Sequence, residues 1–261
     1  MASGNTLFLE PLHESGWRVG LSNLMGAGFA AWWKTNDWWI QVLLWTAVIN
    51  GSLAPFIWGD APDGLDVFTL YGVMSMFAAI AVAIIMQEAI VGEKRSGTAA
   101  WILSKPVSRQ AFMLSKLVPN AVGVIATMVV IPSAFLLLQL TLAGFDVSIP
   151  RFILGATVVS LNLMFYLTLT LMLGTLFDSA GPVIAIPLAF AFGQQLIVGI
   201  PGVGAVLPWA LVVAVDGSDV SVTSAIISGE PIPAQGAIVV TLVACAIFTF
   251  VAFWKWQRTE L

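Results

Sequence analysis

Long apolar runs, separated by short polar segments, dominate the chain from residue 39 onward. A hydrocarbon core about 30 Å thick needs roughly 20 residues of apolar helix to cross it. Six runs approach or exceed that length: residues 39–58, 68–91, 117–142, 152–177, 182–200 and 236–256. Each run is continuously apolar, which excludes the alternating pattern of a membrane β-barrel. The pattern therefore predicts an all-α polytopic membrane protein with six transmembrane helices.

Two further segments are apolar but are not expected to span the membrane. Residues 17–34 place apolar side chains at helical spacing and predict a helix in the inner membrane interface, with Trp32 and Trp33 at headgroup level. Three glycines weaken that helix, so an irregular lead-in is the alternative. Within the extracytoplasmic loop 201–235, residues 203–215 are apolar but too short to cross. We expect a re-entrant or interfacial segment there, which either closes a pathway like a lid or packs as part of the core.

The composition agrees with a membrane protein. Hydrophobic residues make up 59% of the 261 residues and charged residues 9%, and the mean hydropathy is +0.97. A soluble domain of this length needs a far more polar surface. Because no hydrophilic stretch is long enough to fold separately, we expect one membrane domain over residues 1–261. The net charge of −4 arises from acids and bases that are sorted along the chain, and we expect no nucleic-acid partner.

The basic residues favour one orientation, since Lys and Arg accumulate on the cytoplasmic side. With the N-terminus inside, only Arg151 lies outside, and nine basic residues are cytoplasmic: Arg18, Lys34, Lys94, Arg95, Lys105, Arg109, Lys116, Lys255 and Arg258. Six helices then place both termini in the cytoplasm. The outer loops hold acids that accumulate where bases are excluded: Asp60, Asp63, Asp66, Asp146, Asp216, Asp219 and Glu230. We expect a multi-pass protein of the inner or plasma membrane of a prokaryotic cell.

Several polar residues fall within or at the edges of the predicted spans. Isolated amides in a span usually bridge neighbouring helices, which is the role we expect for Asn50, Asn120 and Asn162, with a gating or pathway role as the alternative for Asn50. A carboxylate in a span is rarer and indicates a functional site. For Glu88 we expect a gating or structural role, with access to water, an ion pair with Arg95 or a proton relay as alternatives.

A pair of adjacent amides, Gln194 and Gln195, falls in the outer half of the fifth predicted span. The pair either lines a polar pathway or holds the outer loop.

The segment 92–116 lies between the second and third predicted spans and holds five of the ten Lys and Arg residues. Gly97 is expected to interrupt the inner end of the second helix. Thr98 then caps a short helix over 99–104, and Pro106 ends that helix. Ser108 caps the helix that continues into the third span. The result is an elbow that runs parallel to the membrane and exposes Trp101.

The spacing Glu93-x-x-x-Gly97-Thr98, then Leu103-x-x-Pro106-x-Ser108-Arg109, then Lys116, resembles the loop between the second and third helices of type-2 ABC exporter permeases. The likeness extends to the length of the chain, the six spans, the interfacial N-terminal helix and the elaborated loop before the last span.

The resemblance implies that this loop couples the permease to a separate cytosolic ATPase, which holds ATP and Mg²⁺. The residues that form or shape that contact would be Glu93, Gly97, Thr98, Trp101, Pro106, Ser108 and Arg109. The resemblance also implies export. A second permease copy or a related permease would complete the pathway, and membrane lipids would surround it.

The chain itself lacks the motifs of a catalyst. It has no Walker-A pattern, no HExxH, no GxSxG and no paired intramembrane carboxylates. One cysteine, Cys245, and one histidine, His13, predict no metal site. We therefore expect a permease that is not an enzyme and carries no cofactor. A structural or anchoring subunit of a larger complex, or a passive channel, are the alternatives.

Overall fold

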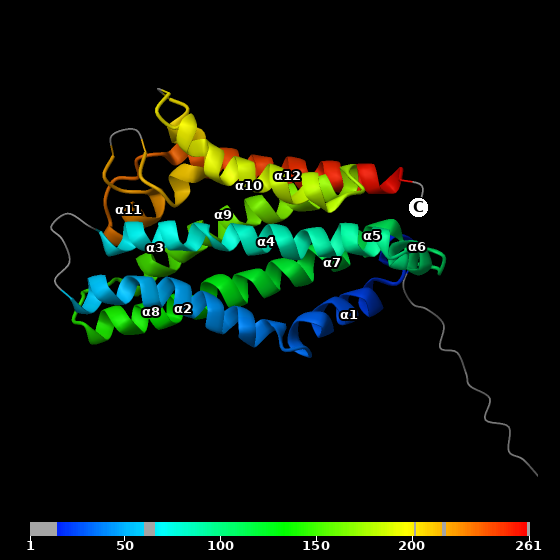
Figure 1. The fold of residues 1–261 in the computed structure, drawn as a ribbon, viewed down its shortest axis with the longest axis horizontal. Coiled ribbons are helices and arrows are strands. Elements are labelled where there is room, and N and C mark those ends of the chain that lie inside the picture. Colours follow the sequence, from blue (N-terminus) through cyan, green and yellow to red (C-terminus); the bar gives the residue numbers. More distant parts are fainter. Residues whose placement is uncertain (1–14, 60–65, 201, 216–217, 260–261) are drawn as a thin grey trace, which may run out of the picture.

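The computed structural model describes residues 15–59, 66–200, 202–215 and 218–259, and these are helical or loop, with no strand among them. Within these residues, five helical stretches are long and apolar enough to cross a membrane. They lie side by side in an elongated bundle (Figure 1): α2 (Asp37–Trp58), the stretch Val67–Arg95, the stretch Arg109–Leu142, α9 (Ile149–Leu176) and α12 (Gln235–Gln257). The all-α membrane architecture predicted from the sequence is confirmed at this level.

The fifth predicted span, 182–200, forms a shorter helix. It consists of α10 (Ala180–Gly193) and a 3-10 turn, η4 (Gln194–Leu196). The apolar stretch Ala180–Leu196 is shorter than the five long stretches, each of which has at least 22 residues. A sixth span therefore stays a prediction, as do the positions of the two termini relative to a membrane.

Both composite stretches contain a widened π-helical turn. The first consists of α3 (Val67–Met76), α4 (Ala78–Gln87), the π segment η2 (Glu88–Gly92) and α5 (Glu93–Arg95). The second consists of α7 (Arg109–Val124), the π segment η3 (Ile125–Val130) and α8 (Ile131–Leu142). The turn in η3 precedes Pro132, which has no N–H to donate. A widened turn is one way to accommodate that missing hydrogen bond.

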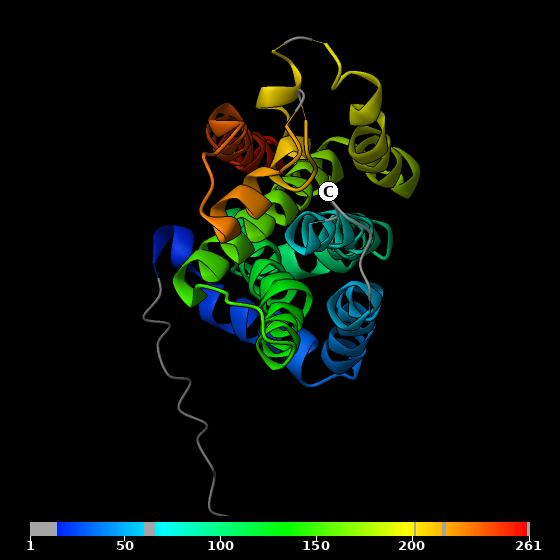
Figure 2. The same ribbon diagram turned by 90° about the vertical axis from the view of Figure 1, so that its left-hand side faces the viewer.

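Helix α9 forms the centre of the bundle. It contacts α12, α11, α4 and α10, and most of its residues are buried, whereas α12 is largely exposed. On α9, the ring of Phe165 meets the rings of Tyr166, Phe190 and Phe248 at centroid distances of 5.3–5.5 Å. Viewed along the bundle (Figure 2), α10 and α12 lie on one side, and α1 and α2 on the opposite side.

Most of residues 17–34 form a helix, as predicted, in place of an irregular lead-in; its location in the membrane interface stays a prediction. A 3-10 turn, η1 (Gly16–Arg18), precedes α1 (Leu21–Trp33), which runs obliquely alongside α7 (Figure 1). Trp32 is buried in that contact, where its ring lies against Gly123 and its indole N–H donates to Asn120 Oδ1 at 2.9 Å. Trp32 is therefore covered by protein, while Trp33 stays exposed; the position of both rings at headgroup level stays a prediction.

The segment before the last helix is packed into the end of the bundle opposite α6. It forms η5 (Gly204–Val206), η6 (Pro208–Leu211) and α11 (Val222–Ser228). Residues 208–212 are buried, and Thr223 Oγ1 donates to the Leu211 carbonyl at 2.7 Å. The Val212 carbonyl lies so close to Gly72 on α3 that a larger residue would collide with it. This arrangement favours buried packing over a lid; Asp60, Asp63 and Asp216 lie outside the described residues.

Candidate functional site: the elbow between α4 and α7

The elbow, residues 92–116, begins with a turn that only glycine adopts easily. Gly97 has a φ of +74° and precedes α6 (Thr98–Leu103) as its N-cap. Thr98 already has helical backbone, and its hydroxyl lies 2.9 Å from that of Ser96. The break at Gly97 is confirmed. The expected cap by Thr98 is wrong, since α6 begins one residue earlier than predicted and its first turn receives no side-chain cap.

One face of α6 packs against the core of the bundle, and the opposite face is exposed. Ala99 is fully buried, and Ile102 and Leu103 pack against the core. Trp101, on the opposite face, has 62% of its surface exposed. The ammonium of Lys105 lies over its ring, 3.8 Å from the centroid, a cation–π contact that orients the indole. Aromatic residues are enriched at protein contact surfaces.

The second bend of the elbow is fixed by Ser108. Its hydroxyl accepts the Ala111 N–H at 2.9 Å, so it caps α7 as predicted. The same hydroxyl donates to the Trp17 carbonyl, and the Ser108 N–H donates to the Val19 carbonyl at 3.0 Å. These bonds attach the bend to the segment before α1. Pro106 lies exposed between the two helices of the elbow.

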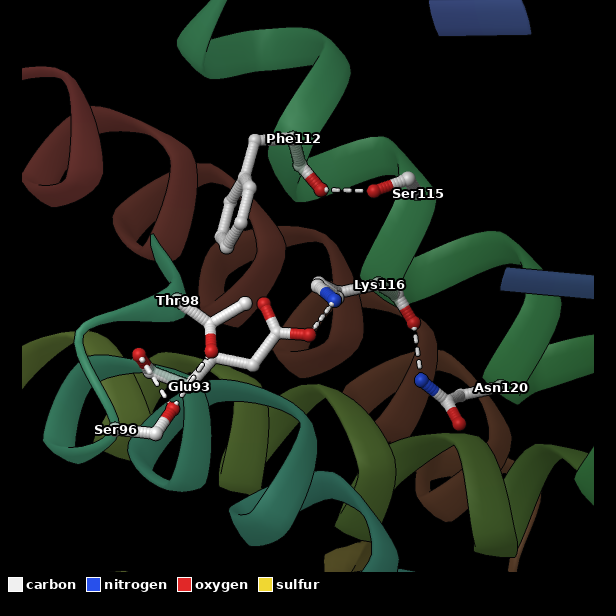
Figure 3. A network of polar contacts seen from close by, with 7 residues as sticks. All are labelled: Glu93, Ser96, Thr98, Phe112, Ser115, Lys116 and Asn120. Atoms are coloured by element: carbon white, nitrogen blue, oxygen red, sulfur yellow. Dashed lines mark hydrogen bonds and ion pairs between the residues drawn. The ribbon is translucent and has the colours of Figure 1, made fainter. Parts of the chain in front are cut away.

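Glu93 faces inward, toward α7, and forms an ion pair with Lys116 (Figure 3). Both side chains are mostly buried, with 25% of Glu93 and 17% of Lys116 exposed. The Lys116 ammonium also lies 5.2 Å from the centroid of the Phe112 ring. The sequence pattern contained both charged residues, but nothing in it indicated that they pair. The ion pair therefore links α5, before the bend, to α7, after it.

The side chain of Arg109, which follows Ser108 at the start of α7, reaches the last helix. Its guanidinium donates to the carbonyls of Trp256, at 3.0 Å, Gln257, at 3.3 Å, and Thr259. The first two carbonyls belong to the C-terminal turn of α12, and Thr259 follows that turn; helical partners are missing there and the helix dipole favours a cation. Arg109 therefore joins the start of α7 to the end of α12.

Sequence reasoning missed a second attachment, which Lys94 makes to the end of α9. Its ammonium lies 2.6 Å from Asp178 Oδ1 and donates to the carbonyls of Gly174 and Phe177 at 3.3 and 3.2 Å. The hydrogen bond from Lys94, together with its charge, lowers the pKa of the Asp178 carboxyl. The only available signal was a lysine at the end of the second helix and an aspartate just after the fourth.

The structure separates the four residues predicted to gate or line a pathway. Glu88 is exposed in the π segment, and neither ion pair found in the described residues joins it to Arg95. Asn50 is buried and donates to the Pro132 carbonyl at 3.1 Å, so it bridges α2 and α8. Gln194 is buried beside the segment 204–212, whereas its neighbour Gln195 is exposed.

Gln194 holds the segment 204–212 in place through both ends of its amide. Its Nε2 donates to the Tyr166 hydroxyl at 3.1 Å, and its Oε1 accepts the Trp209 N–H at 3.1 Å. Of the two roles expected for the glutamines, the geometry at Gln194 fits support of the outer loop. The other amide in this part of the core, Asn162, is fully buried and has no hydrogen-bond partner among the described residues.

The comparison with protein families gives a match over residues 40–261, which begins within α2 and includes the elbow. The matching family is described as Protein of unknown function (DUF2705). The chain belongs to this family. Comparison with curated proteins finds no match. Because the DUF2705 family carries no assigned function, the role of the elbow has to be argued from its geometry and chemistry.

Proposed function

We propose that this protein is the permease subunit of an ATP-driven ABC transporter, and that the elbow docks onto a separate ATPase subunit in the cytosol. In this proposal α10 also crosses the membrane, which brings the number of spans to six. Both termini are then cytoplasmic, and the protein lies in the cell membrane as a multi-pass subunit. The direction, export, follows from the resemblance of the 93–116 pattern alone. ATP and Mg²⁺ are bound by the partner, and this chain is not itself an enzyme.

The observation that carries the proposal is an exposed aromatic ring on a segment that polar contacts attach to the ends of other helices. Trp101 is open to solvent, while the residues around it fasten the elbow to the ends of other helices. Lys94 binds the end of α9, Arg109 binds the end of α12, and Ser108 binds the segment before α1. A surface that transmits a push into a helix bundle needs such attachments, whereas a loop that only sets topology does not.

The attachments define a route for the motion. Closure of the ATPase dimer would displace α6, and the covalent connections would carry that displacement into the stretches Val67–Arg95 and Arg109–Leu142. Lys94 and Arg109 extend the route to α9 and α12. ATP shifts the equilibrium between two arrangements of these helices only if it binds the ATPase more tightly in one of them.

A transport pathway would need a second subunit. Six helices from one chain are few for a pathway, so two copies of this chain, or one copy and a related permease, would form it. Exposed apolar side chains on α12, with Phe250 70% and Val239 61% exposed, are available to lipid or to that second subunit.

Co-purification tests the proposal. The tagged wild-type protein is expected to bring down a subunit that binds ATP, and the chain alone is expected to show no ATPase activity. Trp101→Ala should lose the partner and abolish nucleotide-dependent transport while the protein still inserts. Trp58→Ala is the matched control, because Trp58 is exposed to a similar extent at the far end of α2.

Retention of the ATP-binding subunit by Trp101→Ala at the wild-type level would contradict docking through this ring. A structural subunit or a passive channel, the two rival functions, predicts no ATP-binding partner and no response to nucleotide.

A further inference from the structure

A cavity of about 640 Å³ opens near the elbow, at the end of the bundle that carries α6. It lies between α1, the first turns of α2, the stretch from α4 to α5, and α7. A volume of this size is within the usual range for small-molecule sites, about 300–1,000 Å³. Its apolar lining includes Trp32, Ile40, Ile84, Ile85 and Pro119.

The charged lining of the cavity is unbalanced. Three carboxylates, those of Asp37, Glu88 and Glu93, line it, and Lys116 is the one basic residue of its lining. Lys116 pairs with a single oxygen of Glu93. The second oxygen, Glu93 Oε2, is buried and has no hydrogen-bond partner among the described residues. The cavity therefore presents more negative charge than its own residues neutralise.

Glu88 supplies a carboxylate that no ion pair occupies in the described part of the chain. It begins the π segment η2, and Gly92 ends that segment. The Glu88 carboxylate lies directly over Gly92, at the place where any other residue would put its Cβ atom. Glycine at position 92 thus leaves room for the carboxylate at the wall of the cavity.

We propose that this cavity binds an amphiphilic organic cation, a molecule with a single positive charge on an apolar body. The apolar walls favour the body, and the carboxylates of Glu88 and Glu93 favour the charge, most strongly where water is excluded. An anionic amphiphile of the same shape would meet uncompensated negative charge. A metal ion fits less well, since no group of three His, Cys, Asp or Glu residues within the described ranges is arranged to hold one. This binding needs no nucleotide, so it stands apart from the proposed function.

Equilibrium binding of radiolabelled tetraphenylphosphonium to the full chain in lipid nanodiscs, corrected with empty nanodiscs, tests the proposal. Tetraphenylborate, which has nearly the same shape and the opposite charge, is the matched ligand control. We expect saturable binding of the phosphonium that the borate does not compete away. Saturable binding of both ions with equal affinity would overturn the proposal.

Two variants locate the site. Glu88→Gln removes one exposed carboxylate and should weaken phosphonium binding about tenfold, whereas Glu230→Gln, the same change at the opposite end of the bundle, should leave it unchanged. Ala31→Trp places a large ring at an exposed position of the lining and should abolish binding. Wild-type affinity in either Glu88→Gln or Ala31→Trp would overturn the assignment to this cavity.

The same assay distinguishes two sources of the cation. If an amine-bearing lipid headgroup is the natural occupant, nanodiscs that contain phosphatidylethanolamine should weaken phosphonium binding relative to nanodiscs of phosphatidylglycerol alone, after correction with matched empty discs. Equal binding in the two kinds of disc assigns the cavity to a free amphiphilic cation. Either result supports a cation site in the cavity.

Discussion

Phe112 and Trp256 stack face to face, with ring centroids 5.0 Å apart and ring planes 6° from parallel. Both side chains are fully buried. Phe112 lies one turn into α7, within the elbow, and Trp256 lies in the last turn of α12. The stack and the guanidinium of Arg109 therefore join the same two helix ends. Movement of the elbow cannot leave the end of α12 in place without breaking one of these contacts.

Phe112→Ala should destabilise the protein by about 3–5 kcal/mol, because it removes a buried ring and leaves a cavity against Trp256. Phe250→Ala is the control, since Phe250 lies on the same helix as Trp256 but is 70% exposed, and it should change the free energy of unfolding little. Denaturant unfolding of the detergent-solubilised variants provides the measurement. Equal destabilisation by the two substitutions would show that the stack does not stabilise the α7–α12 contact.

Gln194→Leu should loosen the segment 204–212. It leaves the Tyr166 hydroxyl and the Trp209 N–H without their partner, at a cost of about 1–3 kcal/mol for each unsatisfied buried group. Amide hydrogen exchange over residues 204–212 should become faster. Gln195→Leu is the control at the adjacent exposed position and should leave exchange as in the wild type. Unchanged exchange in Gln194→Leu would mean that other contacts hold this segment.

The pair formed by Lys94 and Asp178 should give stability a specific pH dependence. Because Lys94 lowers the pKa of Asp178, the folded state holds this proton more weakly than the unfolded state. The contribution is present above the ordinary aspartate pKa of about 3.9 and is lost as the pH falls through the lowered value. The effect should be small, since the Asp178 side chain is 89% exposed.

This pH dependence is measured from the melting temperatures of the wild type and of Asp178→Asn. The variant should melt lower at pH 7, and the two curves should converge as the solution becomes more acidic than the lowered pKa. A difference that stays constant from pH 7 to acid would rule out the Lys94–Asp178 pair as its cause.

Gly123→Ala should disturb the contact between α1 and α7. The added methyl group would collide with the buried ring of Trp32, and such overpacking costs about 1–3 kcal/mol. Gly26→Ala, on α1 itself, meets open space and should instead stabilise the helix by about 0.5–1 kcal/mol. Hydrogen exchange of the α1 amides, measured at rising temperature, compares the stability of the two variants. Destabilisation by Gly26→Ala to the same degree would show a general intolerance of α1 to alanine.

Local patterns in the sequence were sufficient for much of the fold. The apolar runs placed α2, α9 and α12 to within about three residues, because lipid requires continuous apolar helix. The breaks at Gly97 and Ser108 were also predictable, since each depends on the backbone or side chain of one residue. These features need no knowledge of what packs against them.

The contacts that define the elbow were not predictable in the same way. Glu93 with Lys116, Lys94 with Asp178, and Arg109 with the end of α12 each join segments that are distant in the sequence. The sequence indicates orientation through its basic residues and, by resemblance, a coupling role for Glu93 and Arg109, but it indicates no partner within the chain for any of these charges. The burial of Trp32 also depends on how α1 lies against α7, which a hydrophobic pattern does not specify.

Photo-crosslinking from position 101 tests most directly whether the elbow is a cytosolic docking surface. A photoreactive phenylalanine analogue replaces Trp101 in cells, and the same analogue at Trp58, exposed at the other end of α2, serves as the control. We predict that position 101 crosslinks to a subunit that binds ATP and that position 58 does not. Crosslinks from position 101 only to lipid or to extracytoplasmic proteins would contradict the account.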